Sequence, residues 1–172
     1  MKIDFRTVRA DEIDIRVSQI DKSWCTLLLF KDARVDQNIL DETVGQMNWQ
    51  RHHSRENANC IVSIWDEEKK QWVEKEDTGV ESFSQAEKGL ASDSFKRACF
   101  NWGIGRELYT APFIWIPAEK ARITSKDFQG KKIYSTTDKF YVEKIQIINK
   151  VITGLAIKNN RNERVFVYQK EA

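Results

Sequence analysis

The strongest constraint on the fold is one helix signal in the middle of the chain. Ser84 is followed three residues later by Glu87, which is the spacing of a capping box at a helix start. Beyond it, apolar and small residues recur so that they fall within about 140° of one another around a helix. They are Leu90, Ala91, Ser94, Phe95, Ala98 and Trp102. Gly103 and Gly105 end the pattern, which predicts a long helix with one buried stripe.

Most of the remaining chain is β-prone. Residues 13–18 alternate apolar and polar side chains, and residues 24–30 form an apolar run after a turn-like Asp21-Lys22, which predicts a hairpin. Two sets of three further strands are expected to form antiparallel meanders. The first set is 48–54, 59–65 and 71–78, and the second is 139–148, 151–158 and 163–169.

A second, shorter helix is expected between the hairpin and the first meander. Asp32 is a plausible N-cap, apolar residues at helical spacing follow it, and Gly45 stands where a left-handed cap is expected. The chain therefore has the order ββ-α-βββ-α-βββ, an α+β fold of antiparallel sheet packed with helices. We expect one domain over residues 1–172, with a β-hairpin-α-βββ-α core at about 13–117, then a basic, weakly patterned stretch and a β-meander over 118–170.

Composition excludes several classes of protein. With 41% apolar and 31% charged residues the chain contains no apolar run near the roughly 20 residues of a membrane span. Its amino end mixes charges of both signs and lacks the apolar centre of a signal peptide, so we expect a cytoplasmic protein. Three cysteines, Cys25, Cys60 and Cys99, lie far apart and form no C-x-x-C pair, which favours buried free thiols over disulfides or zinc.

Charge is unevenly distributed along the chain. Residues 118–132 carry five basic and two acidic side chains, whereas residues 66–77 carry three basic and six acidic side chains. A net charge of +2 does not by itself indicate a partner, because nucleic-acid binding depends on where the charges lie. The pattern predicts one basic and one acidic surface.

The long helix carries cations away from its apolar stripe. Lys96 and Phe100 lie on the opposite face together with Gly89 and Asp93, and Arg97 lies on the flank beside Asn101. Lys96 and Arg97 are suited to pairing with consecutive phosphates, and Phe100 to stacking on a base or packing on another subunit. The alternative interpretation is a charged face that contacts only water.

A mixed aromatic and basic strand, residues 48–55, is a second candidate contact. Gln50, His52 and Ser54 share one face, and Trp49, Arg51 and His53 share the other, so only one set is expected to meet a ligand. Arg51 and Arg55 are candidate DNA contacts on chemical grounds. The adjacent histidines point to opposite faces, and no other His, Cys or carboxylate motif stands at ligand spacing, so we expect no metal.

Two other motifs do not indicate a phosphate loop or a catalytic site. Gly103-Ile104-Gly105-Arg106 follows a helix instead of a strand and lacks the lysine-serine ending of a phosphate loop, so it is better explained as a helix cap. Asp66, Glu67 and Glu68 fall among lysines in the turn of a hairpin, which is how exposed turns are built. No nucleophile stands in a known signature, and we expect no enzymatic activity and no cofactor.

Two passages carry a resemblance to a known family. The first passage resembles the signature helix of the Rad-fifty-two superfamily of single-strand annealing proteins. It consists of residues 80–82 (VES), 86–98 (AEKGLASDSFKRA) and Trp102-Gly103. The second passage resembles the helix-to-strand junction of the superfamily's phage and bacterial branch, often called Sak-like. It consists of residues 32–34, 40–41, 45 and 48–50, with 105–109 (GRELY). Together they cover roughly residues 13–117.

The resemblance implies an ATP-independent protein that acts in homologous recombination and double-strand break repair. Such proteins form homo-oligomeric rings whose basic groove holds single-stranded DNA by its phosphates with the bases exposed, and they cooperate with a nuclease or a single-stranded DNA-binding protein. By position, Lys96 and Arg97 match the family's basic pair, and Arg16 resembles a further groove position. Arg106, within the second passage, joins them as a candidate.

Three departures from the family pattern are visible. The third basic position of the signature helix is Phe100 here, and the segment 78–85 before it is short and without lysine, which leaves a second outer DNA site open. The last meander, 139–169, matches no family feature; subunit contacts and completion of the core are both possible roles. Alternatives to annealing are a passive protein that binds single-stranded DNA or RNA, a nuclease, and a purely structural ring protein.

Overall fold

The computed structural model describes residues 3–80 and 86–170. The fold is α+β, and its sheets are antiparallel. Contacts divide it into two compact units, one of residues 1–7 and 32–106 and one of residues 8–31 and 107–172. Each unit thus consists of two separate stretches of chain. The expectation of a single domain over 1–172 stays a prediction.

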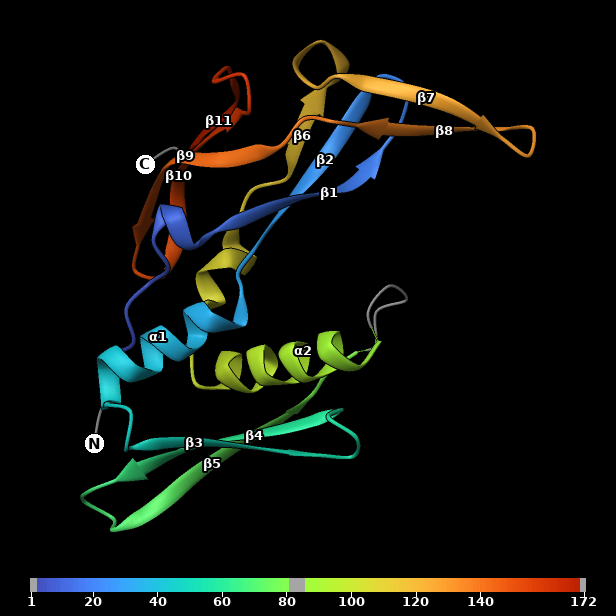
Figure 1. Ribbon diagram of the computed structural model, residues 1–172. Coiled ribbons are helices and arrows are strands. Elements are labelled where there is room, and N and C mark those ends of the chain that lie inside the picture. Colours follow the sequence, from blue (N-terminus) through green and yellow to red (C-terminus); the bar gives the residue numbers. More distant parts are fainter. Residues whose placement is uncertain (1–2, 81–85, 171–172) are drawn as a thin grey trace. The chain divides into compact units, whose positions relative to one another are not determined.

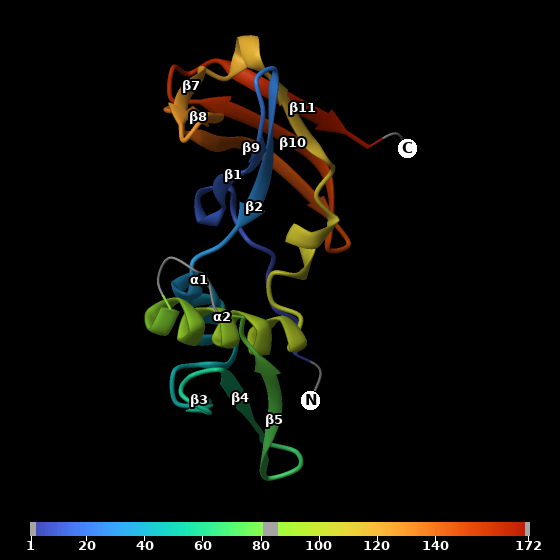
Figure 2. The same cartoon turned by 90° about the vertical axis from the view of Figure 1, so that its right-hand side faces the viewer.

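The first unit is a three-stranded antiparallel sheet with two helices. The sheet has the order β3-β4-β5, and α2 packs on β4 and β5 while α1 contacts α2 and β3. Figures 1 and 2 show α2 lying along one face of this sheet with α1 beside it. The elements are α1 (Ala33–Val44), β3 (Trp49–Ser54), β4 (Asn59–Asp66), β5 (Gln71–Thr78) and α2 (Ala86–Asn101).

Both ends of α1 confirm the sequence prediction. The Asp32 carboxylate accepts a hydrogen bond from the backbone N–H of Arg34 at 2.7 Å, as an N-cap does. Gly45 ends the helix with φ of +85°, a conformation that disfavours any residue with a Cβ. The predicted start of α2 stays a prediction, because Ser84, the first residue of the expected capping box, lies outside the described residues.

The second unit contains two three-stranded sheets with a common core. Their orders are β1-β2-β6 and β11-β10-β9, all antiparallel, and a separate two-stranded hairpin joins β7 to β8. The elements are β1 (Asp14–Ile20), β2 (Trp24–Phe30), β6 (Ile114–Pro117), β7 (Ile123–Phe128), β8 (Lys131–Thr136), β9 (Phe140–Ile148), β10 (Val151–Asn159) and β11 (Arg164–Gln169). Short 3-10 turns occupy Ala10–Glu12, Arg106–Thr110 and Ala118–Lys120.

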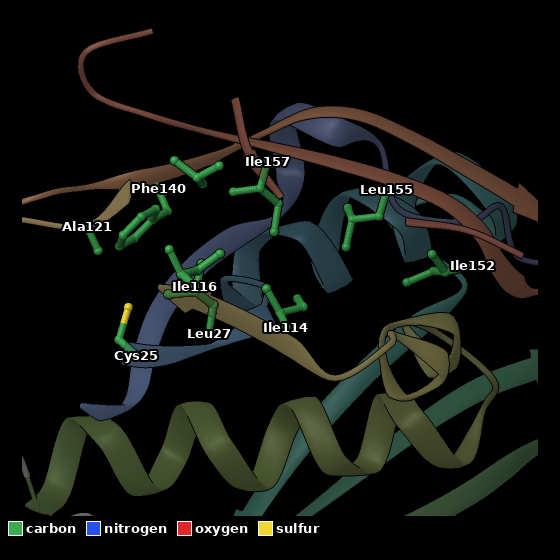
Figure 3. Packing of buried hydrophobic residues seen from close by; sticks show 10 residues of the cluster. Cys25, Leu27, Ile114, Ile116, Ala121, Phe140, Ile152, Leu155 and Ile157 are labelled. Atoms are coloured by element: carbon green, nitrogen blue, oxygen red, sulfur yellow. The ribbon is translucent and has the colours of Figure 1, made fainter. Parts of the chain in front are cut away.

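The core of the second unit lies between its two sheets. Side chains from β2 and β6 meet side chains from β9 and β10 in one apolar cluster, shown in Figure 3. Ile116, Ile152 and Ile157 are fully buried there. The C-terminal meander therefore completes a core together with the first hairpin. This was one of the two roles considered for the meander. Its use in subunit contacts stays a prediction.

The structure contains strands that the sequence pattern did not predict. The stretch 118–137 was expected to be irregular but holds β7 and β8, and β6 comes just before it. Most side chains of β7 and β8 are exposed and none is buried, so neither strand has the regular burial that marks a half-buried strand. The three free cysteines are buried, as predicted.

Candidate nucleic-acid interface

The long helix α2 is fixed by its buried side. Leu90, Ser94, Phe95 and Ala98 are buried, as predicted, and so is Cys99, which the predicted stripe omitted. Gly79, just after β5, approaches the helix so closely that a Cβ there would lie 2.7 Å from the backbone nitrogen of Ser94. This close fit holds α2 against the sheet and leaves the other side of the helix outward.

Three of the predicted DNA contacts lie together on this outward side. Lys96 and Phe100 are half-buried, and Arg97 is exposed. Arg106 follows the helix, and its guanidinium carbon lies 5.3 Å from the centre of the Phe100 ring. We call Lys96, Arg97, Phe100 and Arg106 the α2 ridge.

Arg97 is paired within the helix but stays accessible. Its Nε donates to Oδ2 of Asp93 at 2.9 Å, one turn earlier, and the Arg97 side chain is 45% exposed. The same Asp93 oxygen accepts the backbone N–H of Val80 at 2.9 Å. A surface pair of this kind is worth well under about 1 kcal/mol, so a phosphate is able to compete for the guanidinium.

The charge of Asp93 is maintained by its donors. Partial burial raises the pKa of this carboxyl, but the hydrogen bonds from Val80 and Arg97, with the nearby charge of Lys96, more than offset burial and hold the pKa below its ordinary value. Asp93 is therefore an ionised acidic neighbour of Arg97 and Lys96 on the ridge. Lys96 also lowers the pKa of Asp32 at the start of α1, after the larger effect of Arg34.

Arg106 serves the end of the helix. Its Nε donates to the carbonyl of Phe100 at 2.7 Å, and Nη2 donates to the carbonyl of Asn101 at 3.0 Å. A guanidinium at this position satisfies terminal carbonyls and matches the negative end of the helix dipole. That Arg106 also contacts DNA stays a prediction, and the same guanidinium would then cap the helix and contact a phosphate.

The structure decides which face of β3 is covered. Trp49, Arg51 and His53 lie on the α2 side: the Trp49 ring stacks on Phe95 at 6.1 Å, the Arg51 guanidinium lies 5.0 Å from the Phe95 ring centre, and the His53 ring nitrogen is 3.4 Å from Ser94 Oγ. Arg51 nevertheless stays exposed at this edge strand.

His53 adds no charge to this surface near neutral pH. Burial lowers the pKa of its imidazole below the ordinary value, and the neighbouring Arg51 lowers it further. The imidazole is therefore mostly neutral at pH values of about 7 and above.

The remaining two arginines belong to other elements than the ridge. Arg55 is exposed in the turn between β3 and β4, where residues 55–57 all have positive φ. Arg16 belongs to β1 in the second unit, and its guanidinium lies 5.8 Å from the centre of the Phe30 ring. Both stay candidate contacts.

The uncovered face of the β3-β4-β5 sheet is acidic. Gln50 aligns with Ser63 and Glu74 across the strands, and His52 aligns with Ile61 and Glu76. Both glutamates are exposed. Of the acidic segment predicted from the sequence, Glu74 and Glu76 thus lie on the face opposite α2, whereas Asp77 lies on the α2 side and accepts a hydrogen bond from the Asn101 amide at 3.0 Å.

Asp93 is a partner of Arg97 that the sequence interpretation missed. It was placed on the outer stripe of the helix, but its pairing with Arg97 was not predicted. The signal was present in the chain, because an aspartate four residues before an arginine is a favourable pair on a helix surface.

Within residues 3–80 and 86–170, no three His, Cys, Asp or Glu side chains are grouped as metal ligands are. No helix among those described is long and apolar enough to cross a membrane. Compared with protein-family models, with curated proteins and with solved structures, the chain gives no match.

Proposed function

We propose that this protein binds single-stranded DNA along its phosphates on the α2 ridge and promotes the pairing of complementary strands without nucleotide hydrolysis. The observation that carries the proposal is the position of Lys96 and Arg97, which are adjacent on the outward side of α2, with the Arg97 side chain 45% exposed. The acidic opposite face of the sheet and the resemblance of the helix to the Rad-fifty-two superfamily support it.

Annealing requires no covalent step. It requires that DNA secondary structure be removed, that repulsion between two phosphate chains be reduced, and that base edges stay available. A row of cations that grips phosphates meets all three requirements, because it neutralises the backbone and does not use the bases. No catalytic residue or cofactor is part of the proposal.

A single ridge offers few phosphate contacts, so we propose that several copies act together in a ring. Linking weak sites raises the effective concentration of each for the same strand and gives tight overall binding. The element order β1-β2-α1-β3-β4-β5-α2 is the one expected from the sequence, although β1 and β2 form a sheet with β6 in the second unit. On the resemblance of the α2 sequence to the Rad-fifty-two superfamily, we propose a role in recombination and break repair.

Removal of the negative charge of Asp93, beside the ridge, is expected to strengthen DNA binding. Asp93→Asn retains an oxygen for the Val80 N–H but removes a negative charge beside Arg97 and Lys96. We expect binding of a dT oligonucleotide to tighten by up to about fivefold at 0.1 M salt, roughly the effect of one added phosphate contact.

Because the pKa of Asp93 is lowered, its carboxyl stays ionised across neutral pH. The gain from Asp93→Asn should therefore be the same between about pH 6 and pH 8. Fluorescence anisotropy of a labelled oligonucleotide measures both quantities. Unchanged or weaker binding by the folded variant would show that Asp93 does not compete with phosphate.

The proposed function is tested by the rate at which complementary oligonucleotides pair. With fluorophore and quencher on the two strands and no nucleotide present, the protein should accelerate duplex formation, and the acceleration should decline as salt rises. The second candidate function, passive binding of single-stranded DNA or RNA, predicts tight binding with no acceleration. Metal-dependent shortening of the strands would instead identify a nuclease.

A further inference from the structure

The β7–β8 hairpin is a regular, exposed ribbon within the second unit. Among the residues that the structure describes, its strands pair with each other and with no further strand, from Ile123 opposite Thr136 to Phe128 opposite Lys131. The two-residue turn places Gln129 at φ +50° and Gly130 at φ +76°, the pattern of a type I′ turn that matches strand twist. In Figure 1 the ribbon extends beyond the strands of β1 and β2, with its turn at the far end.

One face of the ribbon combines apolar and cationic groups. Directly opposed residues in an antiparallel pair point to the same side, so Phe128 and Lys131 share a face with Lys126 and Ile133. Phe128 is 60% exposed and Ile133 is 51% exposed. Thr124 continues this face. Such large apolar side chains on a protruding ribbon are suited to burial against a partner.

The charge of the ribbon indicates the kind of partner. Residues 123–136 contain three lysines and one aspartate. Asp127 stands opposite Lys132 on the other face, and neither Lys126 nor Lys131 forms an ion pair with any residue that the structure describes. The face that exposes Phe128 therefore carries two cations and no acidic side chain, and this charge complements phosphate.

We propose that the β7–β8 hairpin is a second contact for single-stranded nucleic acid, in which Phe128 stacks on an unpaired base while Lys126 and Lys131 pair with neighbouring phosphates. An exposed aromatic between cations is the arrangement that holds single strands without reading their sequence. A second copy of the ribbon is a poor occupant, because it carries the same positive charge. One stacked base per subunit leaves the other bases free to pair.

This inference rests on the proposed function, since both concern the binding of single-stranded nucleic acid. Its test is anisotropy of a labelled dT oligonucleotide with the wild-type protein and three single variants. Phe128→Ala should weaken binding at least about fivefold with the salt slope unchanged, because stacking is not a charge contact. Lys126→Ala should weaken it about fivefold at 0.1 M salt and reduce the slope by about 0.7.

Lys132→Ala is the matched control, because it removes the same charge from the other face of the same ribbon. It should bind as the wild type does. If the wild type binds and all three variants bind equally well, the hairpin inference is overturned and the proposed function stands. Equal losses for Lys126→Ala and Lys132→Ala would overturn the assignment of the face.

Two further outcomes distinguish failure of the hairpin contact from failure of the proposed function. If the wild type does not bind the oligonucleotide at all, the proposed function and the hairpin contact both fail. If Phe128→Ala changes the sedimentation of the protein but leaves DNA binding unchanged, the ribbon contacts another copy of the chain, and the nucleic-acid contact is overturned.

Discussion

Replacing Lys96 and Arg97 together by alanine is expected to weaken binding of a dT oligonucleotide about 25-fold at 0.1 M salt. Each phosphate contact contributes about 0.7 to the slope of log affinity against log salt, so two contacts are worth roughly 1.4 logarithmic units at this concentration. The slope itself should fall by about 1.4. The fold should survive, because alanine is a strong helix former and Arg97 is exposed.

The matched control for this pair is Lys69→Ala with Lys70→Ala. These lysines lie in the turn between β4 and β5 of the same unit, where they pair with Asp66 and Glu67. The control removes the same charge at a distance from α2, so binding should change less than about threefold and the slope should be retained. A folded Lys96 and Arg97 double variant that binds as tightly as the wild type would show that α2 is not the DNA contact.

Phe95→Ala is expected to reduce the free energy of unfolding by about 3–5 kcal/mol. Its ring is fully buried, stacks on Trp49 of β3 and lies under the Arg51 guanidinium. Removing it creates a cavity between α2 and β3 and releases both partners. Urea unfolding followed by circular dichroism measures the loss, which is a large fraction of the roughly 5–15 kcal/mol by which an ordinary domain is stable.

Phe113→Ala serves as the control for this prediction, because Phe113 is 76% exposed and its loss should cost within about 0.5 kcal/mol. Should Phe95→Ala fail to yield folded protein, Phe95→Leu, which retains most of the volume, should still cost about 1 kcal/mol. A Phe95→Ala variant as stable as the wild type would mean that α2 does not pack on β3 as described.

The elements with regular local patterns were predictable. Asp32 and Gly45 delimit α1 as expected, and alternation located β3, β4, β5, β9, β10 and β11 to within about two residues. These signals depend only on neighbouring residues. The hairpin β7–β8 was missed because none of its side chains is buried, so that its strands have no buried period to detect.

Long-range pairing was not predictable in the same way. The first hairpin was expected to belong to the same core as α1 and α2, but β2 pairs with β6 and packs on the C-terminal meander. Nothing within β1 or β2 specifies a partner some 90 residues away, since any apolar face of matching width satisfies it. Contacts of this kind are decided by the whole chain.

The candidate site was predictable where helical periodicity applies. The spacing of Lys96 and Phe100 relative to Phe95 placed them outward, and the structure agrees. Alternation along β3 defined two sets of side chains but not which set α2 covers, so the position of Arg51 over Phe95 required the structure. The same holds for Arg106, whose bonds to the end of α2 depend on the path of the chain after Gly103.

The central claim is that cations on α2 hold one DNA strand in a form that a second strand is able to pair with. The most direct measurement is the annealing rate of complementary oligonucleotides with the wild type and with the folded Lys96→Ala and Arg97→Ala double variant, side by side and without nucleotide. The account predicts acceleration by the wild type and little or none by the variant. Equal acceleration by both proteins would contradict it.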